Sequence, residues 1–235
     1  MESKKLVLPY VEGLDNAASL EEFSSMLCNA TAATKVATLN WPDDFPYCPE
    51  CNVRAAWCDK GLGILYNVKG LDLRALAMSD NGSVWQDSCC EFFVSDPCDG
   101  TYYNFEMNCI GTLLVSKRKS REDCVHYTAE KLKKVKRFTS LERKQVEIND
   151  KEFSWSVGMF IPFSLIGIDK YHIPTSLKAN FYKCGDLTAH THFLSWSPID
   201  APKPDFHRPD FFGTLELAPK PASSFARIIF PLMFI

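Results

Sequence analysis

Two segments decide the fold: Asp87–Ser95, with the sequence DSCCEFFVS, and Tyr102–Ile110, with the sequence YYNFEMNCI. Both alternate in side-chain character with a period of two, and Asp96-Pro97 and Asp99-Gly100 supply turn residues between them. This pattern predicts two antiparallel strands joined as a hairpin. Alternate residues of a strand point to opposite faces, so one face of the second strand is apolar and the other polar. The apolar side chains are Tyr103, Phe105, Met107 and Cys109, and the polar face carries Tyr102, Asn104, Glu106 and Asn108.

Similar short alternating segments continue along the chain and predict an all-β fold, an antiparallel β-sandwich of jelly-roll-like type. Ser19-Leu-Glu-Glu22 matches a capping box, so a short helix is expected near Ser19–Asn29, and Ala129–Phe138 has a second helical pattern. We expect one domain over residues 1–220, followed by an apolar tail of unknown role at 221–235. The further strands are expected at Val53–Trp57, Leu62–Val68, Phe153–Phe160, Leu177–Lys183 and Gly213–Leu217.

The composition excludes several classes of partner. The net charge of −3 gives no basic footprint for nucleic acid. No apolar run approaches the roughly 20 residues of a membrane helix. Met1–Tyr10 shows no signal-peptide pattern, so a cytoplasmic location is the default expectation and the ten cysteines are expected to be reduced. We expect a monomer.

Two patterns resemble metal sites but lack a complete set of ligands. Cys48 and Cys51 form a CxxC pair without the second pair that structural zinc normally requires. His190, His192 and His207 could together hold a catalytic metal, although polar loop histidines explain them more simply. No nucleophile or phosphate-loop motif is present, and acidic pairs such as Asp87 and Glu91 are the remaining candidates for hydrolysis.

The aromatic residues suggest a binding surface. Trp57 and Trp155 fall on alternating apolar faces and are expected in the core, whereas Trp85 and Trp196 lie in loops beside polar residues. An indole ring can pack on a sugar ring while amides and carboxylates bind its hydroxyls. A solvated sheet face with tryptophans that cap the core would show the same pattern.

The segment Val84–Val94, VWQDSCCEFFV, resembles the W-x-x-D-x-x-E-x-F strand of family 9 carbohydrate-binding modules. Tyr102–Thr112, Ala179–Gly185, His192–Pro198 and Pro204–Gly213 resemble the free-standing family 9-like proteins of Bacteroides-type gut bacteria, and the likeness spans about Trp41–Leu217.

The resemblance implies a β-sandwich in which two tryptophans hold a terminal sugar, often of a glucan or xylan chain, as in plant-type or gut polysaccharides. Trp85 and Glu91 match the family's sugar-binding pair, and Trp196 is the candidate for the second wall. No counterpart of the family's arginine is found on the neighbouring strand, where Asn104, Glu106 and Asn108 stand instead as candidate ligands. The resemblance allows a structural calcium ion, and no cofactor is required.

The sequence therefore predicts non-catalytic carbohydrate binding and no enzyme activity. Two alternatives remain open. The first is a hydrolytic or hydrolase-associated enzyme that uses the acidic face. The second is a structural or interaction module that docks through its apolar tail.

Overall fold

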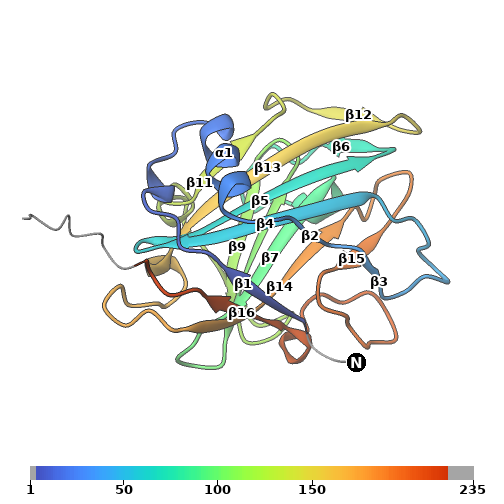
Figure 1. The fold of residues 1–235 in the computed structure, drawn as a ribbon. Helices are drawn as coiled ribbons and strands as arrows, with labels where there is room; N and C mark the ends of the chain where they lie inside the picture. The colour runs from blue at the N-terminus through green and yellow to red at the C-terminus, as the bar shows by residue number, and fades with distance from the viewer. Residues whose placement is uncertain (1–3, 222–235) are drawn as a thin grey trace, which may run out of the picture.

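The computed structural model describes residues 4–221 and consists mainly of two stacked sheets (Figure 1). Trp57 and Trp155 both lie in the core between the sheets, as the alternation predicted. The large sheet has nine strands. Seven of them lie side by side in the order β1 (Lys5–Leu8), β16 (Gly213–Leu217), β14 (Ser176–Cys184), β7 (Cys89–Ser95), β8 (Tyr102–Asn108), β9 (Leu113–Arg118) and β10 (Cys124–His126). The other two form a branch, in which β15 (Phe193–Ser195) pairs with β14 and with β3 (Thr38–Leu39). The second sheet has the order β11 (Lys136–Thr139), β13 (Phe153–Pro162), β5 (Gly61–Gly70), β4 (Glu50–Cys58) and β2 (Thr34–Lys35). A third, small sheet pairs β12 (Val146–Ile148) with β6 (Leu73–Ala75).

The predicted hairpin is confirmed at the centre of the large sheet. In the β7–β8 register, Phe92 lies opposite Phe105 and Glu91 lies opposite Glu106. The two phenylalanines are fully buried between the sheets. Because side chains alternate, the two glutamates point to the other face of the large sheet.

That other face is also covered, by a second apolar cluster that includes Trp41, Phe93, Tyr182 and Phe206. Phe206 comes from the proline-rich loop that follows β15, and its ring stacks on Tyr182 with 4.2 Å between centroids. As a result every residue of β8 is buried, although five of its seven side chains are polar or carry a hydroxyl group. The polar face is therefore not a solvated sheet surface.

The predicted first helix is α1 (Leu20–Ala30), and it lies against the outer face of the second sheet (Figure 1). The Ser19 side chain accepts a hydrogen bond from the Glu22 backbone N–H, which confirms the N-cap. The Phe23 ring of α1 packs on Gly158 of β13. A Cβ at that position would come within 2.9 Å of the ring, so the glycine lets the helix approach the sheet closely.

The second helical pattern is confirmed only in part. The helix α2 spans Ala129–Leu132, and Phe138 lies instead in strand β11. Phe138 stacks on Phe23 of α1, with 4.5 Å between ring centroids, whereas Leu132 and Val135 pack in the main core, so the apolar spacing does not mark one longer helix.

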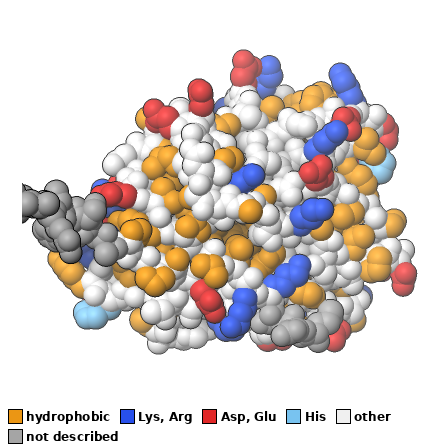
Figure 2. All heavy atoms as spheres, viewed as in Figure 1, with side chains coloured by type: hydrophobic (Ala, Val, Ile, Leu, Met, Phe, Trp, Pro, Cys, Tyr) orange, Lys and Arg blue, Asp and Glu red, His pale blue; other side chains and the backbone are white. Residues whose placement is uncertain are grey.

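Four short 3-10 helices complete the described elements: Leu14–Asn16, Val84–Gln86, Phe163–Leu165 and Pro209–Phe211. On the face shown in Figure 2, charged side chains of both signs are scattered among apolar and polar ones. Among residues 4–221, no helix is long and apolar enough to cross a membrane. The apolar tail that the sequence singles out lies, from residue 222 onward, outside the described residues.

Candidate functional site

A pocket of about 290 Å³ opens on the covered face of the large sheet. Neighbouring strands β7, β8, β9 and β14 supply its floor, so backbone hydrogen bonds fix the spacing of the floor side chains. The walls come from the Val84–Gln86 turn, from the start of β15 and from the proline-rich loop. The floor residues are Glu91, Glu106, Arg118 and Cys184, and the walls include Trp85, Phe193, Phe206 and His207.

Two carboxyl groups dominate the floor. Glu91 and Glu106 are direct cross-strand partners and are only 3% and 4% exposed. Burial raises the pKa of Glu106 to about 7, against the opposing effects of the Asn104 amide and Arg118. Burial and then the charge of Glu106 raise the pKa of Glu91 well above its ordinary value. At neutral pH this pair can therefore both donate and accept hydrogen bonds.

Asn104 joins the acidic part of the floor to a basic one. Its side-chain nitrogen donates to Glu106 Oε1 at 2.6 Å, and its oxygen accepts from Arg118 Nε at 2.8 Å. Asn104 is fully buried beneath the pocket and positions both neighbours without lining the pocket itself.

Arg118 is the functional residue that the sequence reasoning missed. No arginine was expected on this face, yet Arg118 ends β9 directly opposite Tyr102 and lines the pocket. The available signal was the alternation of Leu114, Ser116 and Arg118, which places the arginine on the polar side. Its position in a charge-rich stretch had concealed the strand.

Trp85 forms one wall, and it is half-buried in its 3-10 turn. The Trp85 carbonyl accepts hydrogen bonds from the Asp186 backbone N–H at 3.3 Å and from Cys184 Sγ at 3.6 Å, which fixes the turn against the end of β14. The structure therefore brings Trp85, Glu91 and Glu106 together at one pocket.

His207 and Phe206 also line the pocket, from the proline-rich loop. His207 Nδ1 hydrogen-bonds the Tyr102 hydroxyl at 3.0 Å. Burial and the charges of Arg118 and Arg121 lower the pKa of His207 to about 3, so its imidazole is neutral near neutral pH.

Trp196 lies elsewhere, and its expected role as the second wall needs correction. It is 2% exposed and packs edge-on against Phe181 in the core between the sheets, with 5.6 Å between ring centroids. Its ring also fills the space beside Gly213, where an added Cβ would come within 2.3 Å of it. The alternation that begins in β15 explains the difference, because Leu194 and Trp196 point to the core while Phe193 points to the pocket.

Asn108 does not line the pocket, and its side chain instead makes buried structural hydrogen bonds. Its side-chain oxygen accepts from the Thr112 backbone N–H at 2.9 Å, and its nitrogen donates to Ala77 O and Asp87 Oδ2, both at 3.0 Å. The Asp87 carboxylate in turn accepts from the backbone N–H groups of Leu76 and Ala77. These partners occupy Asp87, so Asp87 and Glu91 are not an available acidic pair.

The three histidines are dispersed among different partners. His190 binds the carboxylate of Asp72 through Nδ1, and His192 Nε2 lies 2.8 Å from the Lys183 ammonium nitrogen. His207 lies in the pocket wall, so the metal-site hypothesis for this trio is wrong.

The CxxC pair does not form a site either, because Cys48 is exposed whereas Cys51 is buried in the core. All ten cysteines, which lie within residues 4–221, are free. Within those residues, one group has the geometry for a metal ion, namely Cys89, Glu91 and Cys184. Two thiols suit a soft metal and not calcium, so calcium remains a prediction without an assigned site.

The fold and the pocket define a β-sandwich protein with a small aromatic and carboxyl-lined site on one sheet. A family model for carbohydrate-binding family 9 matches residues 22–217. The chain therefore belongs to carbohydrate-binding family 9, whose modules are non-catalytic binding modules.

Solved structures agree with this assignment. A protein from Bacteroides uniformis ATCC 8492, provisionally described as carbohydrate-binding, is 38% identical, with 92% of this chain and 100% of that chain covered and a TM-score of 0.82. A family 9 module from Caldicellulosiruptor kristjanssonii in complex with glucose shares the fold at 14% identity, with coverage of 92% and 97% and a TM-score of 0.59. The cellotriose complex of a family 9 module from the same organism gives 13% identity, coverage of 96% and 99%, and a TM-score of 0.61. No curated protein matches the chain.

Proposed function

We propose that the chain binds the terminal sugar of a polysaccharide in the pocket beside Trp85, without catalysis. The observation that carries the proposal is the combination of a half-buried indole wall with Glu91, Glu106 and Arg118 on one floor. A sugar ring can pack on the indole, while the carboxyl groups and the guanidinium bind its hydroxyl groups. The family 9 complexes from Caldicellulosiruptor kristjanssonii contain glucose and cellotriose, which favours a glucan-type ligand.

The second wall in this proposal is the Phe206–His207 segment, in place of Trp196. Phe206 is held in place by its stack on Tyr182, and the neutral His207 adds an imidazole edge to the pocket. One tryptophan and this segment then replace the pair of tryptophans expected from the family resemblance.

The geometry also supports binding without hydrolysis. Hydrolysis of a glycosidic bond needs two carboxyl groups that flank the bond. Glu91 and Glu106 project from adjacent strands of the same floor, so both lie on one side of a ligand in the pocket.

Isothermal titration calorimetry with glucose, cellobiose, cellotriose and xylobiose tests the proposal. One indole face covers roughly 60 Å² of a sugar, worth about 1.5 kcal/mol, so Trp85→Ala should weaken binding about tenfold. Tyr171→Ala is the matched control, because Tyr171 is 77% exposed and remote from the pocket lining. Absence of binding to every sugar, or unchanged affinity in Trp85→Ala, would overturn the proposed site.

A separate experiment tests the proposal that the protein does not hydrolyse its ligand. Prolonged incubation with cello- and xylo-oligosaccharides should release no reducing sugar. A release that disappears in Glu91→Gln would show that the acidic floor is catalytic.

A further inference from the structure

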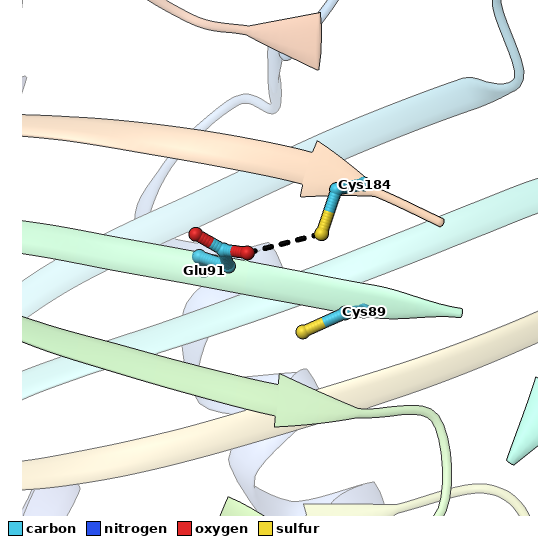
Figure 3. A group of neighbouring side chains, drawn as sticks. All are labelled: Cys89, Glu91 and Cys184. Carbon is cyan, nitrogen blue, oxygen red and sulfur yellow. Dashed lines mark hydrogen bonds between the residues drawn. The ribbon is translucent and has the colours of Figure 1, made fainter. Parts of the chain in front are cut away.

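Two thiols lie beside Glu91: Cys184 lines the pocket with it, and Cys89 is buried next to them (Figure 3). Cys89 and Cys184 are direct cross-strand partners on β7 and β14. Glu91 follows Cys89 by two residues on β7, so all three side chains point to the pocket face. Adjacent sheet strands therefore hold the trio together, and no loop must close to assemble it.

The separations are close to those of a metal site. One sulfur from each cysteine and one Glu91 oxygen all lie within 4.8 Å of one another. Tetrahedral zinc with bonds of about 2.0–2.3 Å needs ligand atoms about 3.5–3.8 Å apart. Side-chain movements of about 1 Å would therefore complete the coordination.

The hydrogen bonding of the trio is weak for such a buried group. Among the described residues, the Glu91 carboxyl accepts one hydrogen bond, from Cys184 Sγ at 3.0 Å. Cys89 Sγ donates to the Cys90 carbonyl at a long distance of 3.8 Å. A thiol is a weak donor, so the buried Glu91 carboxyl is paired with a poor hydrogen-bond partner. A cation would satisfy all three side chains at once.

We propose that Cys89, Glu91 and Cys184 bind a divalent thiophilic cation such as Zn²⁺. Two sulfurs and one carboxylate oxygen are its protein ligands, which leaves the fourth tetrahedral position for water or a sugar hydroxyl. Glu91 and Cys184 line the pocket, so the ion has an entry path. Thiolate ligands select zinc-like ions over calcium or magnesium.

Binding must release protons, because each sulfur ligand loses its thiol proton to solvent and Glu91 loses one whenever it is protonated. Metal affinity should therefore increase steeply with pH. The metal site shares Glu91 with the proposed sugar site, but it does not depend on sugar binding.

Titration of the reduced, metal-free protein with Co²⁺ tests the site, in a Cys28→Ser/Cys48→Ser/Cys98→Ser background that removes the exposed thiols. We expect one Co²⁺ per chain with near-ultraviolet sulfur-to-cobalt charge-transfer bands, which Zn²⁺ abolishes by displacement. The bands should be lost in Cys184→Ser and in Cys89→Ser and retained in Cys109→Ser, whose thiol is buried in the core outside the trio.

Glu91→Gln removes the carboxylate ligand but keeps both thiols, and it should weaken Co²⁺ binding at least tenfold. It also provides a second variant if a serine substitution prevents folding. Absence of stoichiometric charge-transfer bands, or bands that persist in Cys184→Ser, would overturn the proposal. The spectra are recorded without sugar, and sugar titrations use chelator-treated protein. Failure of one proposal is thereby distinguished from failure of the other.

Discussion

Replacement of Glu106 by glutamine should flatten the dependence of stability on pH. The pKa of Glu106 rises from 4.5 to about 7 on folding, chiefly through burial. Folding therefore favours the protonated carboxyl, and this contribution is complete below about pH 4.5 and is lost as pH rises through about 7. Glutamine has the same shape and can still accept the hydrogen bond from Asn104, but it has no proton to lose.

The magnitude follows from the difference between the two pKa values of Glu106. At about 1.4 kcal/mol per tenfold change in proton affinity, the rise to about 7 corresponds to about 3 kcal/mol. Asp186, whose pKa burial raises to about 6, contributes in the same direction at lower pH. His207 acts oppositely, because its lowered pKa costs stability only as pH falls below about 6.5. His207 is present in both the wild type and Glu106→Gln, so its contribution cancels in the difference between their pH profiles.

Urea unfolding between about pH 5 and about pH 8.5 measures the effect, provided that the urea dependence is the same for both proteins. As pH rises across this range, we expect the free energy of unfolding of the wild type to fall by up to about 3 kcal/mol more than that of Glu106→Gln. Glu130→Gln is the control, because Glu130 is exposed at the start of α2. Parallel pH profiles for Glu106→Gln and the wild type would refute the assignment of a buried, protonated Glu106.

Two further predictions concern stability alone. Trp196→Ala should lower the free energy of unfolding by about 3–5 kcal/mol, because the ring is packed in the core, while the folded fraction should bind sugar as before. Urea denaturation with calorimetric titration checks both, and a specific loss of affinity at full stability would restore Trp196 to the site. Ser19→Ala should cost about 1 kcal/mol through loss of the helix N-cap, measured by thermal unfolding, and an unchanged midpoint would show that the cap contributes nothing.

The central fold could be predicted because its strands obey a strict period of two. The alternation in Tyr102–Asn108 separates Phe105 from Glu106 correctly, and the cross-strand register then brings Glu106 beside Glu91. The capping box likewise identified the start of the first helix within one residue. In these segments, local pattern and tertiary structure agree.

The residues whose positions the sequence predicts wrongly are those that depend on neighbouring segments. Trp196 was assigned from its proline-rich surroundings, although it continues the alternation of β15 toward the core. Arg118 was hidden because Lys117 and Lys119 make its strand end look like a solvated charge run. The second helical pattern failed because Phe138 packs under α1 as a strand residue. No local pattern shows that a loop will cover the outer face of the large sheet.

Because the large sheet is buried on both faces, the pocket is built from two kinds of structure, namely central strands for the floor and surface segments for the walls. The floor groups occupy central strands, where any change in backbone geometry would disturb two apolar clusters at once. The walls occupy a single turn near Trp85 and the loop near Phe206, which can vary in length and sequence at far lower cost. Within this scaffold the wall segments can therefore change while the carboxyl and guanidinium groups keep their register on the strands beneath them.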